Sequence, residues 1–320
     1  MLSSTSSSNS KRVLRLRDTR AVSVPILLAI IALSLIGFEL FARVVIERNS
    51  KVQRMVNEEY QEAIHIRHAT GAGPKQLLIV GNSLVGHGLD FDEVQRDMPA
   101  GWEAHRFWIY NTNYDDWYFG LRRVFARGGR PDAVAVVFAA LNWYATGIRG
   151  DYSSQYLFEA RDLSEVQSRL DLTSTTTSSL LFARFSKAFA LRSEVRKVLL
   201  NALVPDLPEM YSLFKPGIAQ PLTDRQVVAI VAPRIQAYRD IARQFGSSLI
   251  VIVPPIERPK EEHQAAMRAA AAEAGVPIFM PMSCADVAHS EFADDMHLDP
   301  AGAKRWTAAM MKQLGPALQH

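Results

Sequence analysis

An apolar run near the N-terminus restricts the topology of this chain more than any other feature. From Ala21 to Ala42, every residue is apolar except two serines and Glu39. A helix needs about 20 apolar residues to cross a bilayer. The length therefore predicts a transmembrane segment at 21–43, in which Glu39 extends toward the polar interface from near one end. A contact between Glu39 and a partner membrane protein is the alternative.

The flanks of this segment predict its orientation. Residues 1–20 are rich in serine and then basic, and basic flanks stay in the cytoplasm. A cleaved signal peptide is the competing interpretation, but its apolar core is normally shorter, and no A-x-A cleavage site follows. The sequence favours an uncleaved signal anchor, single-pass in the cell inner membrane, with a cytoplasmic tail and a periplasmic remainder.

Between the membrane segment and the first predicted strand, residues 44–74 are expected to form a stalk and a linker. Charges alternate in sign and apolar residues recur at helical spacing up to His68, which predicts a helix that lifts the domain off the membrane. Two glycines and a proline in 69–74 indicate a linker. The folded domain is then residues 75–320.

Apolar runs and helical stretches alternate along that domain. Strands are expected at 76–80, 104–110, 133–140, 248–253 and 278–280. The continuous apolar run at 133–140 suits a parallel strand that is buried on both faces. The alternation predicts an α/β fold, a parallel sheet with helices on both faces. Residues 145–225 are expected to be a helical insertion that covers the substrate entrance, or else a peripheral excursion without a functional role.

Ser83 follows the first predicted strand almost at once. The carboxyl end of a parallel strand is where open α/β sheets place their chemistry. Gly81 lets the chain turn sharply there, and a Ser83 N–H that opens a helix can stabilise an oxyanion. The alternative is an ordinary helix start with Ser83 as its N-cap.

A second candidate element stands more than two hundred residues later, just before the last predicted helix. Asp294 and His297 are spaced D-x-x-H. A histidine needs a carboxylate to orient its ring before it can act as a base toward a serine hydroxyl. Three residues apart on one tight loop, the two side chains can both reach a distant serine.

These motifs carry a resemblance to a known family. The tetrapeptide Gly81–Leu84, G-N-S-L, resembles the first block of the SGNH/GDSL hydrolase superfamily, usually written G-D-S-L. The D-x-x-H spacing resembles its last block, and the apolar strand that ends at Asn142 matches the form of its third. The resemblance covers roughly residues 75–145 and 245–318. It implies a three-layer α/β/α sandwich of the SGNH hydrolase type.

The resemblance also implies site residues and a mechanism. Ser83 is the expected nucleophile, His297 the base and Asp294 its orienting carboxylate, with no metal or organic cofactor. The oxyanion hole is implied to use the Ser83 N–H and Asn142. The family's second block contributes a glycine N–H, but the matching segment 110–114 has none, so Asn113 or a nearby N–H is expected to replace it.

Further residues are expected around the substrate. His87 is a rival base that lacks an evident orienting carboxylate, and we assign it to substrate binding instead. Aromatic side chains near the predicted rim, above all Trp143 and Tyr114, are expected to stack against sugar rings. Each of them is individually more typical of core packing.

The membrane segment and the resemblance together favour one function over two others. They predict a serine-dependent O-acyltransferase, with acetyl as the expected group, that takes an acyl donor and modifies a cell-envelope glycan or exopolysaccharide, beside a multi-pass membrane acyltransferase. A carbohydrate esterase or lipase-type hydrolase is the alternative, and a non-catalytic envelope scaffold is a further one. The formal charge of +3, without a basic stripe, gives no indication of nucleic acid binding.

Overall fold

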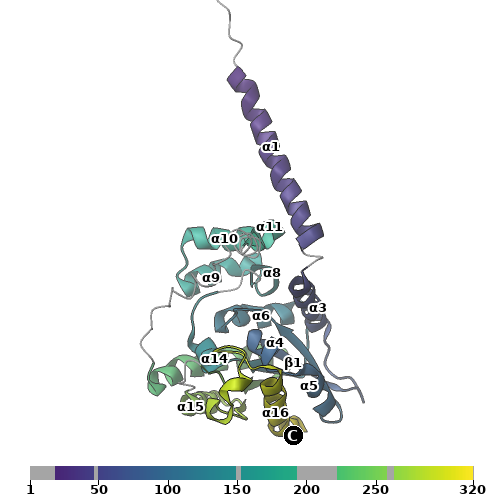
Figure 1. Cartoon of the computed structure of the whole chain (residues 1–320), viewed down its shortest axis with the longest axis vertical. Helices are drawn as coiled ribbons and strands as arrows, with labels where there is room; N and C mark the ends of the chain where they lie inside the picture. The colour runs from purple at the N-terminus through teal and green to yellow at the C-terminus, as the bar shows by residue number, and fades with distance from the viewer. Residues whose placement is uncertain (1–18, 47–49, 149–152, 193–221, 258–262, 320) are drawn as a thin grey trace, which may run out of the picture.

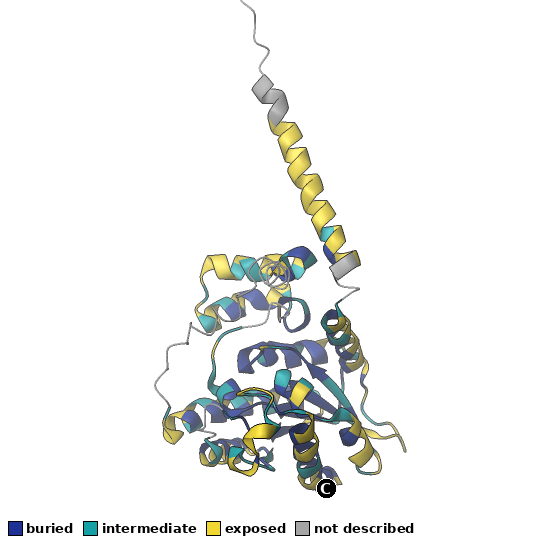
Figure 2. Ribbon diagram, in the orientation of Figure 1, coloured by how far each residue is buried: buried dark blue, intermediate teal, exposed yellow. Residues whose placement is uncertain are grey.

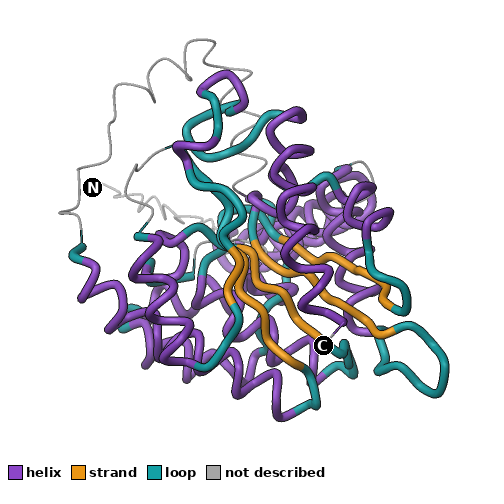
Figure 3. The backbone as a smooth tube through the Cα atoms, turned by 90° about the horizontal axis from the view of Figure 1, so that it is seen from below, coloured by secondary structure: helices purple, strands orange, loops and turns teal. Residues whose placement is uncertain are grey.

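A single sheet with helices on both faces forms the body of the molecule (Figure 3). The computed structural model describes residues 19–46, 50–148, 153–192, 222–257 and 263–319.

The sheet has five parallel strands in the order β2-β1-β3-β4-β5. Their bounds are Lys75–Gly81 for β1, Trp102–Trp108 for β2, Ala133–Val137 for β3, Ser248–Ile252 for β4 and Ile278–Phe279 for β5. In the register, Gly81 at the end of β1 pairs with Val137 at the end of β3. The carboxyl ends of these central strands therefore meet at one edge, as the sequence predicts.

Both faces of the sheet are covered, which makes three layers. One face carries α3 (Lys51–His65), α6 (Tyr114–Ala126), α7 (Ala140–Tyr144), α14 (Asp224–Gln244) and α15 (Gln264–Ala274). The other carries α4 (Ser83–Gly88), α5 (Phe91–Asp97) and α16 (Pro300–Gln319). Successive residues of β1 point to opposite faces of the sheet. Leu78 and Val80 pack against the first helical layer, and Leu77 and Ile79 pack against the second. The predicted α/β sandwich with a parallel sheet is confirmed.

Helix α3 differs from the predicted stalk. Val56, Tyr60 and Ala63 on its inner side are buried in the core. Glu59 forms an ion pair with Arg106 of β2 at 2.7 Å. The amphipathic pattern predicts a helix that lifts the domain off the membrane, but the apolar side of α3 belongs to the domain, which therefore begins before residue 75.

The insertion is helical where the structure describes it. It contains α8 (Ser153–Tyr156), η2 (Ala160–Asp162), α9 (Leu163–Leu170), α10 (Ser174–Phe185) and α11 (Lys187–Ala190). Phe158, Leu163 and Val166 pack against Phe119 of α6, so the insertion rests on the first helical layer. Two other parts of it, 149–152 and 193–221, lie outside the described residues.

The N-terminal helix α1 (Thr19–Phe41) extends away from the sheet and continues into the π-helix η1 (Ala42–Ile46) (Figure 1). Its residues Val24–Val44 are long and apolar enough to cross a membrane. Figure 2 shows this helix exposed along most of its length, whereas the sheet and its helices have a buried interior.

Glu39 does not extend alone toward the interface as predicted. Its carboxylate accepts hydrogen bonds from the Ser186 hydroxyl at 2.7 Å and from the backbone N–H of Lys187 at 3.0 Å, at the start of α11. The contact is with this chain's own insertion.

Candidate active site

Ser83 is presented by a sharp turn between β1 and α4. A Cβ added at Gly81 would lie 2.4 Å from the carbonyl oxygen of Val137, so only glycine lets β1 approach β3 this closely before the turn. Asn82 is the N-cap, and its Oδ1 accepts the N–H of Leu84 at 3.0 Å. Ser83 is therefore the first residue of the helix, not the N-cap of the alternative interpretation.

The cap residue also ties the turn to the loop after β2. Asn82 Nδ2 donates to the carbonyl of Thr112 at 3.1 Å, and Trp117 Nε1 donates to the Thr112 hydroxyl at 3.0 Å. An aspartate at this position would lack the N–H₂ donor for that bond. The Asn82 amide thus joins two loops at the carboxyl edge of the sheet.

The D-x-x-H segment is a tight loop held at its base. Phe292 and Leu298 form an isolated antiparallel bridge, and the Ala293 N–H donates to the His297 carbonyl at 2.8 Å. The short helices η3 (Cys284–Asp286) and η4 (His289–Glu291) precede the loop, and α16 follows it. Asp299 caps α16 by accepting the Gly302 N–H at 2.7 Å. The loop geometry is therefore set independently of any substrate.

The structure brings Ser83, His297 and Asp294 into one hydrogen-bonded chain. Ser83 Oγ lies 2.8 Å from His297 Nε2, and His297 Nδ1 lies 2.8 Å from Asp294 Oδ2. A proton on Nδ1 is held by the carboxylate, which leaves Nε2 free to accept the serine proton. The three side chains come from two segments 214 residues apart.

The electrostatics of Asp294 favour its charged form. Partial burial alone would raise the pKa of this carboxyl, but hydrogen bonds from the His297 ring and from the backbone N–H groups of Met296 and His297 hold the pKa below its ordinary value. Asp294 is therefore an anion at neutral pH.

Asn142 lies at the same edge of the sheet. It belongs to α7, which follows β3 directly, and the segment before it touches α4 through contacts among Leu84, Ala139 and Ile256. Its side chain is buried, and its Oδ1 has no hydrogen-bond partner among the residues that the structure describes. Buried amides without a full set of partners are uncommon in folded proteins, so this side chain is a candidate ligand contact.

In the segment 110–114, the structure shows how the predicted Asn113 is held. Asn113 is buried as the N-cap of α6, where its Oδ1 accepts the Asp115 N–H and its own N–H donates to Asp116. Only Asn113 Nδ2 is left, without a partner within the described ranges. Asn111, which the sequence did not single out, has φ 56°. Asparagine tolerates this left-handed region better than most residues, so a glycine-like turn forms without glycine.

His87, which the sequence assigns to substrate binding, lies beside His297. The two rings are edge to face with centroids 5.3 Å apart, and the Tyr110 hydroxyl lies 3.3 Å from His87 Nε2. Burial lowers the pKa of His87, and the nearby His297 lowers it further. A neutral ring that is exposed to solvent can accept or donate a hydrogen bond at the mouth of the site.

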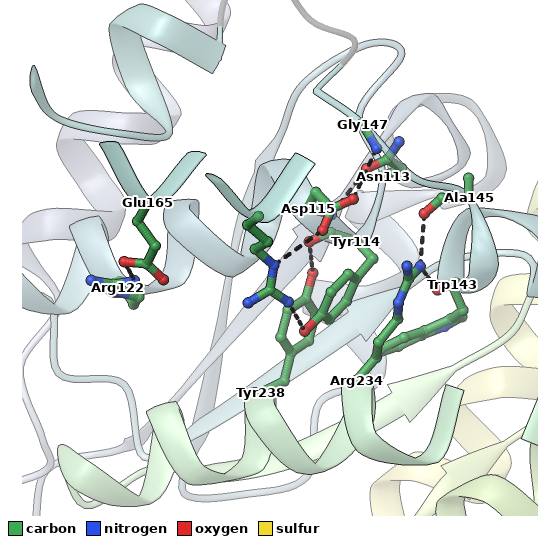
Figure 4. Close-up of polar contacts among 11 residues, drawn as sticks. Asn113, Tyr114, Asp115, Arg122, Trp143, Ala145, Gly147, Glu165, Arg234 and Tyr238 are labelled. Atoms are coloured by element: carbon green, nitrogen blue, oxygen red, sulfur yellow. Dashed lines mark hydrogen bonds and ion pairs between the residues drawn. The ribbon is translucent and has the colours of Figure 1, made fainter. Parts of the chain in front are cut away.

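Tyr114 and Trp143 do not line a substrate site; the prediction that they stack against sugar is wrong. Both side chains are almost completely buried. Figure 4 shows them inside a polar network with α14. Tyr238 donates to the Tyr114 carbonyl at 2.6 Å, and Arg234 Nη1 donates to the Trp143 carbonyl at 2.6 Å. Their role is to fix α6 and α7 against α14.

The described part of the chain contains no group of three or more His, Cys, Asp or Glu side chains placed to hold a metal ion.

Comparisons with known proteins give distant likenesses. No family model and no curated protein sequence matches the chain. Among solved structures, one similar chain is a protein from Streptococcus pneumoniae with the provisional description of a platelet activating factor: TM-score 0.39, 10% identity, 82% of this chain and 94% of that chain covered. Another is an acetylxylan esterase from Geobacillus stearothermophilus: TM-score 0.37, 11% identity, 77% and 97% covered.

Proposed function

We propose that this chain is a membrane-tethered, serine-dependent O-acyltransferase of the SGNH type that modifies a cell-envelope glycan through an acyl-enzyme on Ser83. The observation that carries the proposal is the hydrogen-bonded chain from Ser83 Oγ through His297 to Asp294. In this arrangement a weakly acidic hydroxyl has a base within reach, and the base has an orienting anion.

The proposed reaction has two halves. Ser83 Oγ attacks the acyl carbonyl of the donor while its proton passes to His297 Nε2, and the leaving alcohol takes that proton away. A glycan hydroxyl then gives its proton to the same nitrogen and attacks the ester, and Ser83 Oγ leaves with the proton. Asp294 stabilises the imidazolium in both halves.

The developing oxyanion requires donors at the edge of the sheet. We assign the Ser83 N–H at the start of α4, the Nδ2 group of Asn142 and, in place of the family's second-block glycine, a backbone N–H of the turn at Asn111. Asn113 Nδ2 is the alternative for the last of these. Each such donor is typically worth about 3–4 kcal/mol of transition-state stabilisation.

Two features support acyl transfer to a glycan over hydrolysis. Helix α1 is suited to cross a membrane, and the hydrogen bonds of its Glu39 with the insertion hold the domain beside it. A tethered enzyme works on acceptors that are present at high local concentration near the membrane. The exposure of Asp294, at 58%, favours the second candidate, an esterase open to water.

The experiment measures how the acyl group is partitioned. The full chain in detergent is given an activated acetyl ester with and without envelope oligosaccharides, and acetylated sugar and free acetate are both quantified. The proposal predicts that sugar diverts acetyl from water and that Ser83→Ala abolishes both products. Equal acetate release whatever sugar is added identifies an esterase, and turnover that survives Ser83→Ala contradicts the site assignment. The absence of any Ser83-dependent turnover favours the scaffold.

A further inference from the structure

A small group of exposed apolar side chains lies on the insertion, far along the chain from the membrane segment. Leu181, Phe182 and Phe185 on α10 are 38%, 61% and 65% exposed, and we call them the apolar patch. Within the described ranges, all other large apolar side chains exposed to this degree lie between Val24 and Val44. The patch therefore has the surface chemistry of the membrane segment.

The patch also lies beside that segment. A groove of about 590 Å³ is lined on one side by α1 and on the other by α10 and α11. Its apolar lining residues are Leu35, Ile36, Phe38 and Leu40 from α1, and Phe182, Phe185, Ala188 and Phe189 from the insertion. Figure 1 shows α10 and α11 next to the end of α1 that faces the domain.

The rise of the helix gives the distance of this groove from the end of the apolar segment, and so its depth in a membrane. The part of the chain suited to span a membrane ends at Val44, five residues beyond Glu39. A helix rises 1.5 Å per residue, so Glu39 lies about 7–8 Å inside that end. Interfacial apolar helices bury their apolar face about 5–10 Å into the boundary between headgroups and acyl chains. Phe182 and Phe185 of the patch share the groove with residues on either side of Glu39 and so lie at that depth.

The polar groups around the groove have hydrogen-bond or ion-pair partners within the protein, as groups in an apolar environment require. In lipid, backbone N–H groups need a partner from the protein itself. Glu39 accepts from the N–H of Lys187 at 3.0 Å and of Ala188 at 3.1 Å, and from the Ser186 hydroxyl at 2.7 Å. Arg43, one helical turn away at 2.6 Å, neutralises the carboxylate. Glu39 thus has a structural role within the apolar segment, because it accepts the backbone N–H groups at the start of α11.

We propose that the apolar patch is inserted into the bilayer that α1 crosses, in the leaflet nearest the domain, and that α10 is a second membrane contact. The occupant of the groove is lipid: acyl chains against the phenyl rings, with headgroups beside Arg43 and Arg192 at its edge. Two contacts with the membrane, one spanning and one interfacial, hold the domain in one orientation. This inference rests on α1 spanning a membrane and is independent of the chemistry at Ser83.

The experiment measures where the patch lies when the full chain is in a membrane. In a Cys284→Ser background, a nitroxide is attached through Phe182→Cys or Phe185→Cys, and the protein is reconstituted in phosphatidylcholine–phosphatidylglycerol vesicles. Collision rates with lipid-soluble oxygen and with a water-soluble nickel chelate are compared. Leu33→Cys, in the middle of α1, reports the lipid environment, and Ser168→Cys, exposed on the neighbouring helix α9, reports water.

The proposal predicts that positions 182 and 185 favour oxygen over nickel as position 33 does, and that position 168 shows the reverse. Nickel access at 182 and 185 equal to that at 168 overturns it. Shielding from both reagents also overturns it, because protein, and not lipid, then covers the patch. Nickel access at 33 removes the premise and the proposal with it. Acyl transfer is not part of the readout, so failure of the proposed reaction leaves the result unaffected.

Discussion

At the scale of residues, the site depends on a carboxylate that is fixed without being buried. Asp294 is 58% exposed, yet it accepts hydrogen bonds from the His297 ring and from the backbone N–H groups of Met296 and His297. These bonds hold the pKa of Asp294 below its ordinary value. The carboxylate thus sets the orientation of His297 toward Ser83 while remaining an anion.

Replacing this carboxylate is expected to disable the base. Asp294→Asn keeps the shape of the side chain but removes the charge and disturbs the ring tautomer, so kcat is expected to fall by about 10²–10⁴-fold with little change in folding. The measurement is kcat for a soluble activated ester, determined for the wild type and for each variant. Asp295→Asn, the adjacent exposed carboxyl of the same loop, is the matched control and is expected to keep wild-type kcat. Equal losses in the two variants would contradict the assignment.

Much of this site could be predicted from single residues, and the errors share one cause. Ser83, Asp294 and His297 occupy turns that are held by residues close in sequence. Their motifs therefore indicate where each side chain lies and which way it points. Tyr114 and Trp143 are different, because whether an aromatic ring is exposed depends on what covers it. Here the cover is α14, which lies about a hundred residues further along the chain, and nothing in the local sequence reports that contact.

At the scale of elements, helix α4 carries Ser83 and is positioned by a close contact with β2. A Cβ added at Gly86 would lie 2.2 Å from the indole of Trp108, whereas one added at Gly88 meets nothing within 4 Å. The glycine at 86 therefore lets α4 lie directly on Trp108, and the height of Ser83 above the sheet follows from it.

The two glycines make a matched pair for mutagenesis. Gly86→Ala is expected to displace α4 or Trp108, at a cost of about 1–3 kcal/mol of stability, with a loss of activity beyond that of unfolding. Gly88→Ala is expected to stay within about 0.5 kcal/mol of wild type. Thermal unfolding and acyl-enzyme formation, measured on both variants, test this. Wild-type acylation in Gly86→Ala would mean that the position of α4 is not critical.

The contact between α3 and β2 predicts a pH dependence of stability. Burial raises the pKa of Glu59 to about 7 from its ordinary 4.5, although the charge of Arg106 opposes the rise. The folded state then binds this proton more tightly than the unfolded chain, so the stabilisation is complete below about pH 4.5 and is lost as pH rises through about 7. The loss is at most about 3 kcal/mol.

Thermal unfolding between pH 5 and 8 measures this effect. Glu59→Gln remains neutral and is expected to remove this part of the fall in Tm with rising pH. Glu58→Gln, exposed on the same helix, is expected to retain it. Identical pH dependence in the two variants would show that Glu59 is not the titrating group.

Helix α3 also shows what the sequence could not reveal about the elements. Its period and its charges predict a helix correctly, but the choice between a free stalk and a packed helix depends on partners elsewhere. Arg106 lies on β2, and the apolar residues that meet Tyr60 come from β2 and the insertion, at Phe107 and Tyr156. An amphipathic helix reports that it has an apolar side, not which surface covers it.

At the scale of the whole molecule, α3 belongs to the domain and α1 is attached to it through the insertion. Removing α1 and removing α3 should therefore have different consequences. A chain that begins at residue 50 keeps Val56, Tyr60 and Ala63 in the core and is expected to fold in mild detergent. A chain that begins at residue 75 loses them. Each large apolar side chain contributes about 1.5–3 kcal/mol on burial, against a total of about 5–15 kcal/mol for a domain.

Circular dichroism and thermal unfolding of the two shortened chains distinguish these outcomes. The longer one is expected to unfold cooperatively, and the shorter one to aggregate or to unfold without a transition. A stable, cooperative chain from residue 75 onward would restore the stalk interpretation of α3.

The intact mass of the full chain after brief exposure to an activated acetyl ester shows whether Ser83 is the nucleophile that carries the acyl group. The proposed reaction predicts one acetyl group, located on Ser83 by peptide mapping. It predicts no such adduct in Ser83→Ala and much slower formation when His297, 2.8 Å from the hydroxyl, is replaced by alanine. An adduct that forms equally in Ser83→Ala, or ester turnover by the wild type at a different residue, would contradict it.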